Sequence, residues 1–321
     1  MKAKAIAHPM EGLVKYHGLR DWNLRIPYHD SISVNLEAFN TTTEIEFGDF
    51  GEDVALVNGV RLQGREFERV KSVVDYVRKL AGISENFYMT SSNSIPKGTV
   101  KGLGFSSSAG AALATASYKA AGLDKRLGWD YTLLSRIARR LAGSACRSVV
   151  GYYARWYAGR SDEDSYAVCF AEPKDLDIRV IVVPFYVEFR TEDGHREAEL
   201  SPFFESRTIS AQKRCDELEK AIKNGDFKRF GELVESDALE LHAVTMTGPG
   251  RLILATSDSW RVVQKVLQLR NQGVECYFSM QTGPTVFVNT LPENVSTVVE
   301  SVKDLGYKAY VSNIGGPARA L

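Results

Sequence analysis

Glycine and serine residues gather in one segment, Pro96 to Gly110, immediately before a run rich in alanine. Glycines let backbone amides turn toward an anion, serines add hydroxyl donors, and a following helix presents its positive end to the same point. The segment is therefore predicted to bind phosphate groups. It is not a Walker A loop, because the pattern G-x-x-x-x-G-K-[ST] is absent. A flexible connection before a buried small-residue helix is the structural alternative.

Alternating strand and helix patterns must position this segment. In the first half, strands are predicted at 31–36 and 43–47, and helices at 66–80, 107–121 and 131–141. The second half has a β-rich run at 178–189, helical patterns at 210–224, 228–243 and 257–272, strands within 276–288, a helix at 295–305 and a strand near Tyr310. The character changes near 172–178, which predicts two domains, 1–175 and 176–321, in an α+β layer sandwich.

Composition excludes several classes of function. The 321 residues are 44% hydrophobic and 25% charged, as in ordinary globular proteins, and 40 basic residues balance 40 acidic ones, so no nucleic-acid partner is expected. The N-terminus lacks the apolar core of a signal peptide, and no run reaches transmembrane length. Four widely spaced cysteines suit reduced thiols rather than a zinc site. We therefore expect a cytoplasmic protein without a membrane partner.

Four ordered segments carry a resemblance to known proteins. Residues 96–110 are similar to P-x-x-x-G-L-x-S-S-A, and 12–34 to K-Y-W-G-K-R-D followed by L-P-x-N-x-S-I-S-V. Residues 143–148 match G-S-A-C-R-S at every position, and 281–285 are similar to D-[AT]-G-[PA]-[NST]. The first motif belongs to the GHMP kinases and the others to mevalonate-pathway decarboxylases. The chain therefore resembles this decarboxylase family over positions 12 to 285, most of its length.

The resemblance implies a fold and a reaction. The fold is the GHMP kinase fold, with an N-terminal β/α ATP-binding domain, a C-terminal ferredoxin-like α/β sandwich and the substrate between them. ATP, with Mg²⁺, phosphorylates the 3-hydroxyl of a phosphorylated mevalonate, and loss of that phosphate with carbon dioxide leaves an isopentenyl product. Relatives are often dimers, so a homodimer is expected.

The motifs also imply roles for single residues. The fork of Arg147 suits bidentate binding of the substrate carboxylate, and Lys15 places a charge beside the 3-oxygen. Tyr16 and Ser144 offer hydroxyls to substrate phosphate oxygens. Without the motif, Arg147 could simply cap a helix, and Lys15 could end a solvated strand.

The phosphate loop implies the nucleotide site. Glycine amides and serine hydroxyls would hold the ATP phosphates, and Ser107 would help to order magnesium. The residues expected at this site are Gly102, Gly104, Ser106, Ser107, Ser108 and Gly110.

The segment after Lys15 bears on the phosphate tail of the substrate. His17 and Leu19 stand where the family signature has tryptophan and a second lysine, while Arg20 matches its arginine. His17 and Arg20 are predicted to contact the substrate, with a structural histidine as the alternative for His17. Because one cation is lost, a monophosphate tail is favoured over a diphosphate. The sequence of this segment also resembles that of archaeal and Chloroflexi phosphomevalonate decarboxylases.

Gln281 stands where the family carries its catalytic aspartate. A glutamine is neutral and cannot act as a general base, so we expect binding to survive and turnover to be impaired. Three alternatives follow: a diphosphomevalonate decarboxylase, a 3-hydroxyl kinase without decarboxylation, and a ligand-binding homologue without catalysis. No chemistry is assigned to His8, His195 or His242, because their spacing fits no metal site.

Overall fold

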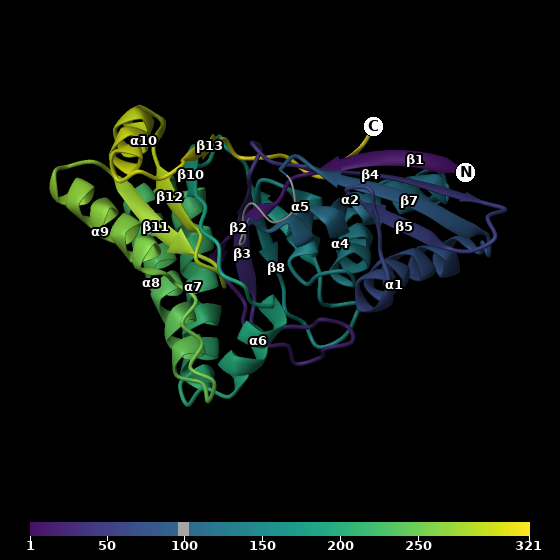
Figure 1. Cartoon of the computed structure of the whole chain (residues 1–321), viewed down its shortest axis with the longest axis horizontal. Coiled ribbons are helices and arrows are strands. Elements are labelled where there is room, and N and C mark those ends of the chain that lie inside the picture. The colour runs from purple at the N-terminus through teal and green to yellow at the C-terminus, as the bar shows by residue number, and fades with distance from the viewer. Residues whose placement is uncertain (96–102) are drawn as a thin grey trace.

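The computed structural model describes residues 1–95 and 103–321. In its N-terminal half, one sheet has the strand order β14–β1–β4–β7–β5–β6 (Figure 1). Its strands are β14 (Arg319–Ala320), β1 (Lys2–Ala7), β4 (Thr41–Gly48), β7 (Asn86–Asn93), β5 (Val54–Val57) and β6 (Val60–Arg61). Along β1 and β4, buried residues alternate with more exposed ones, as expected for a sheet with one covered face.

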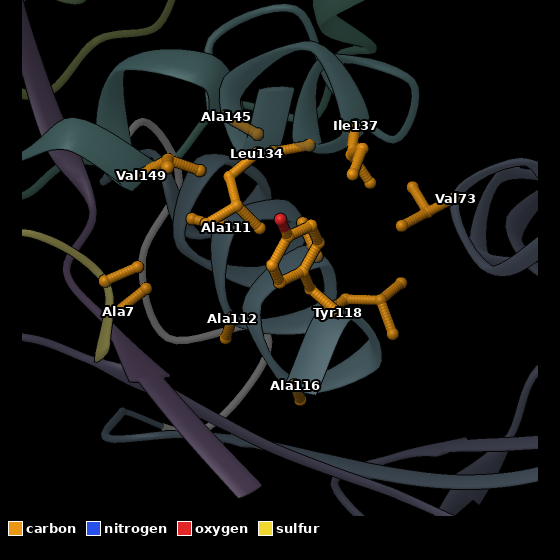
Figure 2. Close-up of a cluster of buried hydrophobic side chains, with 14 of the residues drawn as sticks. Ala7, Val73, Ala111, Ala112, Ala116, Tyr118, Leu134, Ile137, Ala145 and Val149 are labelled. Atoms are coloured by element: carbon orange, nitrogen blue, oxygen red, sulfur yellow. The ribbon is translucent and has the colours of Figure 1, made fainter. Parts of the chain in front are cut away.

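Helix α2 lies at the centre of the N-terminal half. It contacts the sheet on one side and its neighbouring helices on the other, and Figure 2 shows its alanines and Tyr118 within this core. The helices of this half are α1 (Gly64–Ala81), α2 (Phe105–Ala120), α3 (Leu123–Leu127), α4 (Tyr131–Arg139) and α5 (Ala145–Val150). A Cβ at Gly110 would lie 2.6 Å from the Cβ of Ala145, so this glycine permits α2 and α5 to pack closely. The packing fixes the start of α5 relative to the start of α2.

A second sheet joins the two halves of the molecule. Its strand order is β2–β3–β8–β9, formed by β2 (Met10–Val14), β3 (Ser31–Asn35), β8 (Tyr153–Trp156) and β9 (Ala167–Ala171). It lies between α5 and the long helices α7 and α8, as Figure 1 shows. Leu13 and Val14 of β2 share a hydrophobic cluster with Phe230 and Val234 of α8. The two halves therefore have a common core.

The C-terminal half is a sheet covered by helices. The sheet has the order β11–β12–β10–β13, formed by β11 (Cys276–Met280), β12 (Val286–Thr290), β10 (Arg179–Val183) and β13 (Tyr310–Ser312). Its helices are α6 (Thr191–Glu199), α7 (Phe204–Lys223), α8 (Phe227–Met246), α9 (Ser257–Asn271), the short 3-10 helix η1 (Pro292–Asn294) and α10 (Val295–Asp304). Figure 1 shows α6 at the lower end of the junction between the two halves.

The end of the chain returns to the N-terminal half, which differs from the predicted domain 176–321. In β14, Ala320 pairs with Ala5 of β1. Gly151, with φ of +71°, permits this return, because a Cβ there would lie 2.2 Å from the backbone nitrogen of Pro317. The predicted domain 1–175 thus gains its edge strand from the C-terminus. Among the described residues, no helix has the length and apolar character needed to cross a membrane.

Candidate active site

A cavity of about 650 Å³ lies where the two halves meet. The end of β2, the starts of α2 and α5, helix α6 and the segment after β11 all contribute to its wall. Predicted site residues that line it are Lys15, Tyr16, Gly104, Ser106, Ser144 and Gln281. Predicted residues that the described wall does not include are His17, Arg20, Ser107, Ser108, Gly110 and Arg147. Gly102 lies outside the described residues.

Arg147 is fully buried beside the cavity. Its guanidinium carbon lies 5.9 Å from the centre of the Tyr16 ring. Nη1 donates to the carbonyl of Ile32 at 3.2 Å, whereas Nε and Nη2 have no partner among the described residues. Burial lowers the pKa of this arginine. A buried charge with unused donors is costly, so the position favours an anionic ligand that reaches behind Tyr16.

Lys15 directly follows β2, is buried and lines the cavity. Its exposed fraction is 5%, its Nζ lies 4.8 Å from the Tyr16 ring, and it makes no ion pair with a described carboxylate. Its backbone N–H donates to Oδ2 of Asp237 at 2.9 Å, and its carbonyl accepts from Nη2 of Arg207 at 2.9 Å. Burial, and then the charge of Arg147, lower the pKa of Lys15 to about 7, while Asp237 acts in the opposite direction.

Gln281 follows β11 and faces Lys15 across a glycine. Its side-chain Nε2 donates to the backbone carbonyl of Met10 at 3.1 Å. The backbone carbonyl of Gln281 lies 3.0 Å from Nε2 of His242. A Cβ at Gly12 would lie 3.2 Å from Cδ of Lys15 and 3.5 Å from Oε1 of Gln281. The two side chains therefore border the same space over Gly12, which a larger residue would fill. His242 has a structural contact here that its spacing in the sequence did not reveal.

Two histidines pack against each other near Tyr16, and only His17 was predicted from the sequence to belong to the site. His17 is buried, its Nε2 lies 3.3 Å from Oγ1 of Thr282, and burial holds its pKa well below the ordinary value. His195 of α6 lines the cavity and stacks on Tyr16 with the ring centres 4.9 Å apart. Its Nδ1 accepts the N–H of Gly18 at 3.1 Å, so Nε2 carries the ring proton. No motif or regular spacing pointed to His195.

Arginines at the cavity wall also escaped the sequence analysis. Arg25 lies 3.5 Å from Glu192, and Arg65 pairs with the other oxygen of the same carboxylate. Arg69 donates from Nε to the carbonyl of Leu141 at 2.8 Å. These contacts join α1, the segment before β3 and α6, which are far apart in the sequence. Nothing in their local patterns could have predicted that they meet.

The start of α2 presents a polar surface to the cavity. Gly104 is the N-cap with φ of +71°, and among the described residues no side chain caps the helix. Ser106 is exposed and lines the cavity. By contrast, the hydroxyl of Ser107 donates to the carbonyl of Gly104 at 2.5 Å, and that of Ser108 lies 2.6 Å from Oγ1 of Thr41. Ser106 thus lines the cavity, while the hydroxyls of the next two serines bond within the protein.

Arg20 and Gly110 serve packing in this structure. Arg20 is exposed and donates to the carbonyls of Gly159 and Tyr28 at 3.0 and 3.2 Å. It therefore links two loops outside the cavity wall. Gly110 lies on the face of α2 that packs against α5. The predicted phosphate contact of Gly110 and the predicted substrate contact of Arg20 stay predictions.

Comparisons with known proteins agree with the motifs. The family description "diphosphomevalonate decarboxylase-like N-terminal domain" matches residues 7–167, and "mevalonate 5-diphosphate decarboxylase C-terminal domain" matches residues 190–312. Phosphomevalonate decarboxylase of Haloferax volcanii is 41% identical over 325 residues, which cover 100% of this chain and 98% of the relative.

Solved structures extend the similarity to three dimensions. The crystal structure of mevalonate diphosphate decarboxylase from Staphylococcus aureus has a TM-score of 0.92 at 32% identity, covering 100% of this chain and 98% of the other. A structure of MDDEF in complex with MVAPP, AMPPCP and magnesium has a TM-score of 0.90 at 30% identity, covering 100% and 99%.

Proposed function

Since the chain belongs to the mevalonate 5-diphosphate decarboxylase family, we propose that it converts mevalonate 5-phosphate to isopentenyl phosphate. Its mixed α/β architecture is the GHMP-type fold that the motifs predicted. At the level of the family, the activity is the ATP-dependent decarboxylation of a phosphorylated mevalonate in isoprenoid synthesis. The monophosphate is the finer part of the proposal, and the Haloferax relative that carries this name supports it.

The observation that carries the monophosphate is the wall around Leu19. This apolar residue lines the cavity at the position of the signature lysine, and its N–H donates to Oε1 of Glu199 at 2.8 Å. The carboxylate of Glu199 therefore lies beside the backbone of Leu19, at the position where the family signature has a cation. Arg25 and Arg65, which also line the cavity, share the single carboxylate of Glu192, which offsets one of their two charges. A second phosphate left uncompensated in a partly buried site is costly.

The other polar groups suit the rest of the substrate. Arg147 has two unused buried donors, which match the two oxygens of a carboxylate. Tyr16 and Ser144 line the cavity and offer hydroxyls to phosphate oxygens. Lys15 provides a nitrogen for the region of the 3-hydroxyl, beside Gln281. We assign the substrate to this end of the cavity.

The opposite end fits the phosphates of ATP. No described side chain caps the start of α2, and the dipole of this helix favours negative charge at this point. The described residues include no cluster of three His, Cys, Asp or Glu side chains that would hold a metal ion. A magnesium ion carried by the phosphates themselves is compatible with that wall. When bound, it neutralises charge on the transferred phosphoryl group.

A 3-hydroxyl kinase that stops before decarboxylation is the second candidate. The observation in its favour is Gln281, whose amide donates to the carbonyl of Met10 and supplies no negative charge to the reacting centre. The impaired turnover expected from this residue stays a prediction. The two candidates differ in product, because the kinase leaves a stable 3-phosphate and releases no carbon dioxide.

The substrate proposal is tested by comparing kcat/KM for mevalonate 5-phosphate and its diphosphate in the wild type and in Leu19→Lys. We expect the wild type to prefer the monophosphate. The added ammonium should shift the ratio toward the diphosphate by about tenfold or more, the value of a hydrogen bond to a charged group. Leu127→Lys is the matched control, because Leu127 is 49% exposed and lies outside the described cavity wall. A wild type that prefers the diphosphate contradicts the proposal.

We also propose a cytoplasmic location and a homodimer. The four cysteines are free thiols, which is typical of proteins in reducing compartments. The dimer rests on the family resemblance alone. Light scattering of the purified protein distinguishes one chain from two, and a monomer at all concentrations contradicts the dimer.

A further inference from the structure

Phosphoryl transfer to the 3-hydroxyl needs an acceptor for the hydroxyl proton. At position 281 the neutral amide of glutamine cannot take that proton. Besides the phosphate oxygens themselves, a side chain of the cavity near the same point can then be the acceptor. The titratable groups that line its described wall can be considered one at a time.

Most of these groups are excluded by their contacts. Burial raises the pKa of Tyr16, so its phenol stays protonated. In His195, Nδ1 already accepts the N–H of Gly18, which leaves Nε2 as a donor. Glu192 is engaged by two arginines, and Glu66 is exposed on the first turn of α1. Arginine does not lose its proton in proteins.

Lys15 is the group that remains, and the fold holds it at the required place. Its side chain and that of Gln281 border the same space over Gly12, and both residues line the cavity. Both its backbone N–H and its carbonyl are bound by side chains of the C-terminal helices, Asp237 of α8 and Arg207 of α7. These two side chains are each 2% exposed and lie 2.7 Å apart as an ion pair. A buried pair of this kind has a fixed geometry and would be costly to break.

We propose that Lys15, positioned through its backbone by the Asp237–Arg207 pair, is the proton acceptor for the 3-hydroxyl group. The proposal rests on the proposed function and assigns the acid–base role that Gln281 cannot perform. Asp237 and Arg207 are positioning residues, because they contact the backbone of Lys15 and neither of them lines the described cavity wall.

The reaction balances with this assignment. The neutral amine of Lys15 takes the hydroxyl proton as the 3-oxygen forms a bond to the γ-phosphorus of ATP. The bond between that phosphorus and the bridging oxygen breaks, and ADP leaves. The 3-phosphate then departs with the electrons of its C–O bond, and the electrons of the bond to the carboxyl carbon form the double bond as carbon dioxide leaves. Lys15 returns its proton to solvent after product release.

The charges around Lys15 support an amine that is neutral near pH 7. Arg147 on α5 lowers its pKa, and Asp237 on α8 raises it. His195 on α6 and His17 on the same segment are neutral, because burial holds the pKa of each well below its ordinary value. Burial is the largest cause and brings the pKa of Lys15 to about 7. A base poised near the working pH is the most effective.

The pH dependence of kcat/KM distinguishes Lys15 acting as a base from Lys15 acting as a fixed cation, because the two roles give limbs of opposite slope. With Lys15 as the base, kcat/KM of the wild type rises tenfold per pH unit below about pH 7 and levels above it. With Lys15 required as an ammonium, kcat/KM falls above about pH 7, and this result overturns the proposal. Phosphates of the substrate and ATP also titrate in this range, so Lys15→Arg is the matched control. It keeps the charge, and should lose about 10²-fold to 10⁴-fold in kcat together with the Lys15 limb.

A limb that persists unchanged in Lys15→Arg belongs to the substrates and overturns the proposal. Asp237→Asn retains an acceptor for the Lys15 N–H and removes the negative charge, so the limb should move about one unit lower. If this variant does not fold, NMR titration of isotope-labelled lysine in the wild type, assigned with Lys15→Arg, gives the same pKa directly. A value near 10 overturns the proposal. Absence of carbon dioxide from both phosphates in the wild type would instead refute the proposed function.

Discussion

A buried carboxyl group between the two halves makes stability depend on pH. Glu11 of β2 is fully buried, and its Oε1 accepts from Nδ2 of Asn289 on β12 at 2.8 Å. Its Oε2 has no partner among the described residues. Burial, opposed by hydrogen bonds from Asn289 and Ser279, raises the pKa of Glu11 from 4.5 to about 7. The native protein therefore prefers the protonated acid, which can donate where the carboxylate cannot.

The sign and size of the effect follow from linkage. Between pH 4.5 and about 7, the native state binds a proton at Glu11 that the unfolded chain has lost. The free energy of unfolding therefore falls as the pH rises through this window, by about 1.4 kcal/mol per unit and on the order of 3 kcal/mol in all. The neutral amide of Glu11→Gln removes this loss. The variant should be more stable than the wild type at pH 8 by on the order of 3 kcal/mol, and within ~1 kcal/mol of it at pH 5.

Urea unfolding at the two pH values measures both differences. Glu293→Gln is the matched control, because Glu293 is exposed and makes no ion pair with a described residue. Its stability should follow that of the wild type at each pH. The reasoning is refuted if Glu11→Gln is less stable than the wild type at pH 8, or if its advantage there equals that at pH 5.

Three further variants test the packing and the site. Gly110→Ala should lower the free energy of unfolding by ~1–3 kcal/mol, because its Cβ would lie 2.6 Å from a side-chain carbon of α5. Gly51→Ala is the control, because a Cβ there would have nothing within 4 Å. Equal losses of stability in the two variants would contradict the reasoning. Arg147→Lys should lower kcat/KM by at least ~tenfold, since one ammonium replaces the bidentate fork, and unchanged kcat/KM would exclude this role. Gln281→Asp should move the Lys15 pH limb ~1–3 units higher, because a carboxylate favours the ammonium, and a fixed limb would place the two groups apart.

Long, strongly patterned elements were predictable from the sequence. The helix expected at 66–80 is α1 (Gly64–Ala81), and the alanine-rich helix at 107–121 is α2 (Phe105–Ala120). The strands expected within 276–288 form the hairpin of β11 and β12. In each case the local periodicity and composition agree with burial in the fold.

Short elements stabilised by distant contacts were not predictable. The β-rich run expected at 178–189 ends as β10 at Val183, and α6 (Thr191–Glu199) follows without a strong helical pattern. This helix packs against the cavity and carries His195 there. The two-residue strand β14 exists through its pairing with β1, so the sequence has no local signal for the return of the C-terminus.

The candidate site divides in the same way. The motifs identified Lys15, Tyr16, Ser144 and Gln281, which the fold brings to one cavity. The hydrogen bond from the Lys15 N–H to Asp237 joins residues more than 200 positions apart in the chain. The arginines of the cavity wall likewise depend on contacts between separate helices and loops. Such contacts leave no periodic trace in a single sequence.

The central claim is that this cavity decarboxylates mevalonate 5-phosphate. Phosphorus NMR of the wild type with ATP, magnesium and mevalonate 5-phosphate, combined with measurement of released carbon dioxide, tests it most directly. The account predicts ADP, inorganic phosphate, isopentenyl phosphate and carbon dioxide in equal amounts. A stable 3-phosphate without carbon dioxide, or no consumption of ATP, would contradict it.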